Sequence, residues 1–207
     1  NFAYFKAYVW AVMINNGNKC MTNMAASCFF LGRNISSFQR FLSDNQWEIP
    51  AVARKLVALL LAKLGDRLLI AGALLGCVDT TLAAKASDQM VAVQRWHRHS
   101  GNADQVSSII GHHWGIIGLI VKHPIRYICL PILARLIAGN KNQQLWINGP
   151  DGTRPADFWD CVVALVFELK TYLPSALKLR IVADAYFSKA PFIQPLLAKG
   201  IHLISRL

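Results

Sequence analysis

The stretch LLIAGALLGCVD, residues 68–79, decides the fold, because it is a continuous apolar run that ends in an acid. An uninterrupted run of this length is typical of a strand that is buried on both faces of an α/β sheet. The shorter run LRIVAD, residues 179–184, has a similar form. These two runs predict two buried strands, each with an aspartate, Asp79 or Asp184, at its carboxyl end.

The segments between and after these runs predict the rest of the sheet and the helices that flank it. Apolar runs indicate further strands, and apolar residues at helical spacing indicate amphipathic helices. In order, we expect hairpin strands at 114–122 and 126–137, a helix within 157–173, a helix within 188–200 capped by Ser188, and a strand from residue 201. This order predicts an α/β fold with a mixed sheet, and it is similar to the ribonuclease-H-like order.

Residues 1–65 predict a small all-α region before the sheet, and residues 66–207 predict the first part of the ribonuclease-H-like domain. Asn34 or a serine just after it can cap one helix. Pro50 suits the first turn of the next helix, where its missing N–H costs little. Two short helices joined by a polar segment can dock on DNA, but they also occur in ordinary helical bundles. The pattern alone supports both interpretations.

The charge of the chain favours a polyanionic partner. Lys and Arg number 22 against 11 Asp and Glu, so the formal net charge is +11. The excess is spread along the whole sequence without a basic tail. A distributed positive field suits DNA lying across the surface, although a merely basic protein has the same composition.

A membrane span and a disulfide framework are not expected. The best candidate for a span, residues 56–78, is interrupted by Lys63, Asp66 and Arg67, whereas a spanning helix needs about 20 apolar residues. The five cysteines are widely spaced and include no Cys-x-x-Cys pair, which predicts reduced, mostly buried thiols.

Asp79 and Asp184 are the strongest candidates for chemistry. Parallel neighbouring strands would bring their carboxylates to one edge of the sheet, where ligands bind in open α/β folds. Carboxylate oxygens suit Mg²⁺ or Mn²⁺, and a pair of such ions can promote phosphodiester cleavage. The alternative is that each aspartate only caps the turn that follows its strand.

Four segments together resemble DDE-type insertion-sequence transposases, the broad group of the IS4 and IS701 type, over about residues 38–207. GCVDTTLAAK (76–85) is similar to the first-acid motif of these enzymes. IVADAYFSKAPFIQPLLAKGIHLISRL (181–207) is similar to the second, in which an aromatic residue follows the acid. The other two are FQRFLSDNQW (38–47), which resembles the helical segment before the catalytic core, and NADQVSSIIGHHWGIIGLI (102–120), which resembles the segment between the first two strands.

The resemblance implies that Asp79 and Asp184 are catalytic metal ligands for Mg²⁺ or Mn²⁺. A second acid often follows the first in this family, but Thr80 occupies that position here. The family's third acid, a glutamate, lies further downstream, so we expect this chain to stop before it and to be inactive alone. Glu168 precedes Asp184 and is therefore in the wrong order for that role.

Several other side chains are candidates for DNA contact. Hydroxyl and ammonium groups just after the first acid can bind phosphates, and of two adjacent histidines on a strand at most one can face the site. We place His97 and His99 in a polar loop. The DNA-contact candidates are Arg33, Arg40, Thr80, Thr81, Lys85, His112 and His113.

The resemblance also implies the partners and the reaction. The partners would be double-stranded DNA, as transposon ends and target, and a second copy of the chain in a synaptic complex. We expect a cytoplasmic bacterial protein associated with the nucleoid. Two alternatives stay open: a DNA-binding or dimerisation fragment without activity, and another ribonuclease-H-like nuclease.

Overall fold

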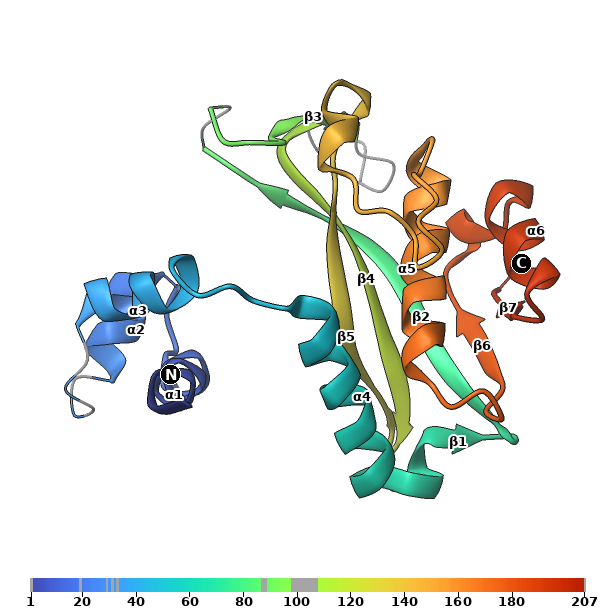
Figure 1. Cartoon of the computed structure of the whole chain (residues 1–207), viewed down its shortest axis with the longest axis horizontal. Coiled ribbons are helices and arrows are strands. Elements are labelled where there is room, and N and C mark those ends of the chain that lie inside the picture. The colour runs from blue at the N-terminus through green and yellow to red at the C-terminus, as the bar shows by residue number, and fades with distance from the viewer. Residues whose placement is uncertain are drawn as a thin grey trace. The chain divides into compact units, whose positions relative to one another are not determined.

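The computed structural model describes residues 2–18, 20–28, 30, 32, 34–86, 89–97 and 108–206, except the side chains of 140, 141 and 143. It divides into two compact units, Asn1–Ile49 and Pro50–Leu207 (Figure 1). This division differs from a boundary after residue 65, because Ala53 and Val57 of helix α4 (Ile49–Leu64) belong to the hydrophobic core of the second unit.

The described residues of the first unit form the α-helices α1 (Phe2–Ile14), α2 (Met21–Ser27) and α3 (Ile35–Ser43). Its small core includes Ala7, Ala11 and Phe38. Asn34 caps α3 as predicted, since its side chain accepts a hydrogen bond from the backbone N–H of Ser37 at 2.8 Å.

The second unit is built on one mixed sheet. Its strands are β1 (Leu69–Ile70), β2 (Ala73–Ala84), β3 (Gln94–His97), β4 (Ser108–Lys122), β5 (Tyr127–Ile137), β6 (Leu179–Val182) and β7 (His202–Ile204). The order is β5–β4–β2–β6–β7, with β3 also paired to β4 and β1 to β2. The β2–β4 and β4–β5 pairs are antiparallel, whereas β6 is parallel to β2 and β7 to β6.

Helices connect the parallel strands. Helix α5 (Phe158–Tyr172) lies between β5 and β6 in the chain, and α6 (Ala190–Ala198) lies between β6 and β7. The 3₁₀ helices in the described part of the second unit are η2 (Gly65–Leu68), η3 (Asn140–Leu145) and η4 (Ala185–Phe187). The chain thus forms the antiparallel strands β2, β4 and β5, and then α5, β6, α6 and β7, in which β6 and β7 are parallel to β2. This is the predicted ribonuclease-H-like arrangement, so the fold class is confirmed.

The main core lies between one face of the sheet and α5 (Figure 1). Val166 and Leu169 of α5 are fully buried, as are Leu74 of β2 and Ile117 of β4. Burying one such side chain contributes about 1.5–3 kcal/mol. This packing fixes the central strands, from which the functional site is built.

Local signals set most element boundaries, with one correction. Asp157 caps α5 by accepting from the backbone N–H of Asp160. The predicted hairpin is present, and the backbone N–H of His123 donates to Arg126 O. The expected cap of α6 is wrong: Lys189, not Ser188, is the N-cap residue, because Ser188 closes the preceding 3₁₀ turn by donating its N–H to Ala185 O.

None of the helices in the described part of the chain is long and apolar enough to cross a bilayer.

Candidate metal and DNA-cleavage site

The sequence predicted Asp79 at the carboxyl end of a strand, but the structure places it within β2. The strand continues to Ala84 because residues 76–84 pair with β4 without interruption. Its parallel pairing with β6 stops earlier, and the last pair is Cys77↔Val182. Asp79 therefore marks the point where β6 leaves β2, which opens space beside its carboxylate.

Asp184 follows β6 by two residues and begins the short helix η4. Every β2–β6 pair has a sequence offset of 105, as in Leu74↔Leu179 and Cys77↔Val182. The same offset separates Asp79 from Asp184. The register that aligns the two strands thus directs both aspartates to one edge of the sheet.

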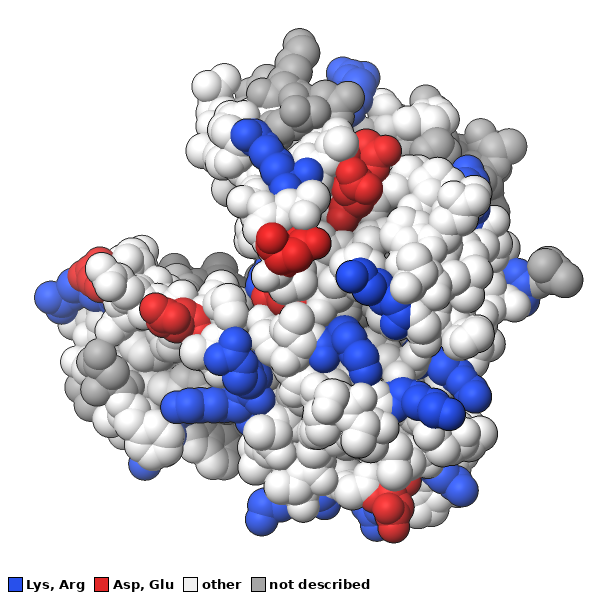
Figure 2. Space-filling model, turned by 45° about the vertical axis from the view of Figure 1, so that its right-hand side comes forward, with Lys and Arg blue, Asp and Glu red and all other residues white. Residues whose placement is uncertain are grey.

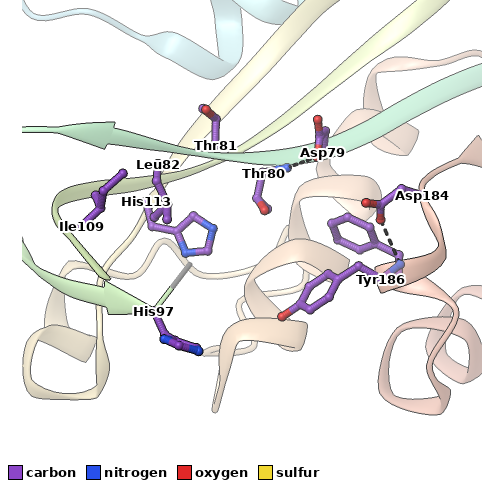
Figure 3. Close-up of a pocket in the computed structure, with 10 residues that line it drawn as sticks. Asp79, Thr80, Thr81, Leu82, His97, Ile109, His113, Asp184 and Tyr186 are labelled. Carbon is purple, nitrogen blue, oxygen red and sulfur yellow. Dashed lines mark hydrogen bonds between the residues drawn. The ribbon is translucent and has the colours of Figure 1, made fainter. Parts of the chain in front are cut away.

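Each aspartate is oriented by its own backbone. One Asp79 carboxylate oxygen accepts a hydrogen bond from the N–H of Thr80 at 2.7 Å, and one Asp184 oxygen accepts from the N–H of Tyr186 at 3.1 Å (Figure 3). Within the described residues, the second oxygen of each carboxylate accepts no hydrogen bond. These two oxygens are the chemical groups that the site offers to a cation.

Both aspartates line one cleft of about 430 Å³. Asp79 and Asp184 lie at one end of it, and His97, Ile109 and His113 lie at the other (Figure 3). The remaining lining residues are Thr80, Thr81, Leu82, Tyr186 and Phe187. The structure therefore brings together four of the residues predicted from the sequence besides Asp184: Asp79, Thr80, Thr81 and His113.

The two adjacent histidines lie inside β4, not before it, and they separate as the strand pleat requires. His113 lines the cleft, where its ring stacks on Phe158 at 5.5 Å between centroids and meets Trp96 edge-on at 4.8 Å. A ring nitrogen of His112 instead contacts Val91 O at 2.9 Å. Only one of the pair faces the site, as expected.

Lys85 does not line this cleft. Lys85 follows β2, and its backbone N–H donates to Ile110 O. Arg40 is on α3 in the first unit, where its guanidinium Nε donates to Ser36 O at 3.4 Å. Arg33 and His99 are outside the described residues.

Two residues of the cleft with polar side-chain groups, His97 and Tyr186, were missed as site residues by sequence reasoning. His97 was assigned to a polar loop, but it ends β3 and reaches the cleft because β3 pairs with the first residues of β4. Tyr186 carried a signal, since an aromatic residue close to the second acid is part of the resembling motif. Burial, followed by the negative charge of Asp184, raises the pKa of Tyr186.

Glu168 lies outside the cleft and is occupied elsewhere. It forms an ion pair with Arg135 of β5 and accepts a hydrogen bond from the hydroxyl of Tyr172 at 2.6 Å. Burial and this hydrogen bond to Glu168 raise the pKa of Tyr172. The placement of Glu168 agrees with its exclusion as the third acid.

The donor set fits a hard divalent cation. Carboxylate oxygens are ligands for oxygen-seeking ions, and Thr81 points to the same side of β2 as Asp79, whereas Thr80 points to the opposite side (Figure 3). Among the described residues, no group of three His, Cys, Asp or Glu side chains is arranged to hold a metal ion. The two aspartates are therefore a partial set, to which water and phosphate oxygens would be added.

The fold and the two-aspartate cleft define a ribonuclease-H-like protein with an acidic site. More particularly, the model of the DDE superfamily endonuclease family matches residues 2–207, and the chain belongs to this family. Membership implies dependence on a divalent metal ion. No curated protein matches the chain.

One solved structure with similarity is described as the crystal structure of the Mos1 strand transfer complex. The sequence identity is 8% and the TM-score is 0.27, and the match covers 98% of this chain and 57% of that chain. This chain thus spans little more than half the length of that protein.

Proposed function

We propose that this chain carries the first two metal-binding acids of a DNA transposase. The observation that supports this most directly is the shared register of β2 and β6, which directs Asp79 and Asp184 to one cleft. Family membership as a DDE endonuclease supplies the reaction class, the hydrolysis and transfer of phosphodiester bonds.

In this proposal Asp79 and Asp184 hold Mg²⁺ or Mn²⁺ through the carboxylate oxygens that make no internal hydrogen bond. When bound, such ions activate an attacking oxygen and stabilise the leaving oxygen. The backbone N–H groups of Thr80 and Tyr186 fix the carboxylate orientations. The hydroxyl groups of Thr80 and Thr81 donate hydrogen bonds to the DNA backbone.

The substrates would be double-stranded DNA, first at the transposon ends and then at the target. A water molecule would cut the end, and the 3′-hydroxyl so formed would attack the target. Arg33, Arg40, Lys85, His112 and His113 remain proposed DNA contacts, with His113 the one of these that lines the cleft. Pairing of two ends calls for a homodimer, and the substrate implies a cytoplasmic location at the bacterial nucleoid.

The decisive experiment compares Asp79→Asn and Asp184→Asn with the unchanged sequence in the complete gene product. Supercoiled plasmid that carries the element's ends is incubated with Mg²⁺ or Mn²⁺, and nicked DNA is measured. We expect each substitution to lower the rate by more than about a thousandfold, which corresponds to about 4 kcal/mol at 1.36 kcal/mol per tenfold. Asp66→Asn, at an exposed acid on η2, is the matched control. Cleavage by Asp79→Asn at the control rate would overturn the assignment.

A second candidate is a DNA-binding role without cleavage for these 207 residues. It is favoured by the absence of a third metal-ligating side chain beside the two aspartates in the described part of the chain. The 207-residue chain should then bind duplex DNA but leave plasmid uncut under conditions in which the complete gene product nicks it.

A further inference from the structure

The wall of the cleft beside Asp184 is aromatic. Tyr186 of η4 lines the cleft, and its ring stacks on Trp159, in the first turn of α5. The ring centroids are 5.3 Å apart and the planes differ by 28°. Phe187, which is fully buried, meets Tyr186 and Trp159 edge-on from behind. The stack therefore has a fixed place beside the second acid.

The ammonium group of Lys189 is held on this stack. Its Nζ atom lies 5.2 Å from the Tyr186 centroid and 5.8 Å from the Trp159 centroid. These distances nearly equal the separation of the two ring centroids, so the ammonium lies over both rings and is not inserted between them. Cation–π attraction thus restricts an exposed lysine that would otherwise sample many rotamers.

The backbone of Lys189 is fixed as well. It is the N-cap residue of α6, and its N–H donates to Phe187 O at 2.8 Å. The preceding N–H, from Ser188, donates to Ala185 O at 3.0 Å. Four residues of tightly turned chain separate Lys189 from Asp184, and the ammonium lies against Tyr186, which lines the cleft.

We propose that Lys189, positioned by Trp159 and Tyr186, binds a backbone phosphate of the DNA strand that enters the cleft. This inference rests on the proposed function and adds a phosphate-binding site to it. An ammonium has three donors and no acceptor, so an anion is its complement. Two carboxylates repel a polyanion, and a cation held on the aromatic wall of the cleft offsets that repulsion.

The test measures the salt dependence of DNA binding. The chain is titrated against a fluorescent 30-base-pair duplex in EDTA, over a series of NaCl concentrations, with anisotropy as the readout. The slope of log K against log salt is negative, and loss of one phosphate contact lowers its magnitude by about 0.9. We expect that decrease for Lys189→Gln, whereas Lys189→Arg should restore the slope.

Lys199→Gln provides a matched control, because it removes the same charge from the opposite end of α6, where Lys199 is the C-cap residue. Its slope should equal that of the unchanged chain. Trp159→Leu keeps the ammonium of Lys189 but removes one of the two aromatic rings that it contacts. DNA binding should therefore weaken at a fixed salt concentration, and circular dichroism would confirm that the variant is folded.

An unchanged slope for Lys189→Gln, or an equal decrease for Lys199→Gln, would overturn the proposal. Unchanged affinity of a folded Trp159→Leu variant would overturn the positioning by the rings. The assay contains EDTA and involves no cleavage. A negative result here therefore leaves the plasmid-nicking test unaffected, and a failure of that test leaves the salt slope interpretable.

Discussion

Glu168 and the pair Asp79 and Asp184 have the same chemical group in two contrasting environments. Glu168 is largely buried between β5 and α5, with a side-chain exposure of 15%, and it is bound by Arg135 and Tyr172. Asp79 and Asp184 are exposed, and each uses one oxygen on a neighbouring N–H. The difference teaches that Arg135 and Tyr172 already satisfy the carboxylate of Glu168, whereas Asp79 and Asp184 each retain an oxygen for a ligand.

The largest expected effect is on the free energy of unfolding when Glu168 is replaced. Glu168→Ala would leave Arg135 buried without its counter-charge, and breaking such a pair costs about 3 kcal/mol of unfolding free energy. Urea denaturation of the chain measures this loss. Glu48→Ala, at an exposed glutamate, should change the stability by less than about 0.5 kcal/mol. A loss below about 1 kcal/mol for Glu168→Ala would mean that the ion pair contributes little.

A smaller effect is expected on the melting temperature when a divalent ion binds Asp79 and Asp184. A divalent ion that binds only the folded chain stabilises it by about 1.4 kcal/mol when its concentration is ten times the dissociation constant. Mn²⁺ should therefore raise the melting temperature of the unchanged chain and of Asp66→Asn. Asp79→Asn and Asp184→Asn should melt close to the unchanged chain without metal and lose this increase. Equal stabilisation of all four proteins would place the ion elsewhere.

The smallest expected effect is a difference in alkylation rate between Cys161 on α5, the helix of Glu168, and Cys77 on β2, the strand of Asp79. Burial, followed by the charges of Asp157 and Asp160, raises the pKa of Cys161 on α5 to about 12. Burial, with smaller contributions from Cys129 and Asp79, raises the pKa of Cys77 to about 11. At pH 8 both thiols are mostly protonated, and the pKa of Cys161 is raised further than that of Cys77. Iodoacetamide should thus modify exposed Cys20 first, then Cys77, then Cys161, as followed by mass spectrometry.

The alkylation rate of Cys77 should also respond to the charge of Asp79. The negative charge of Asp79 raises the pKa of Cys77, so Asp79→Asn should lower that pKa, increase the thiolate fraction at pH 8 and accelerate alkylation by less than about threefold. The rate at Cys161 should stay constant. A slower reaction of Cys77 would contradict the sign of this interaction.

Much of the site could be predicted because its two acids follow apolar runs. The runs at 68–79 and 179–184 indicate buried strands, and the family resemblance identifies the acids that end them. The position of His97 could not be predicted, because it depends on the register in which β3 pairs with the start of β4, which no local pattern specifies. The role of Glu168 depended likewise on Arg135, 33 residues away.

By itself, the sequence predicted the order of the main strands and helices, a cap at the start of α3, and the two acids proposed as metal ligands. Burial pattern and capping chemistry are local, so neighbouring residues suffice to encode them. Only the tertiary structure decided that β2 continues beyond Asp79, that His113 and not His112 faces the cleft, and that Lys189 rests on two rings. These features depend on strand register and on contacts between distant segments, which no local pattern specifies.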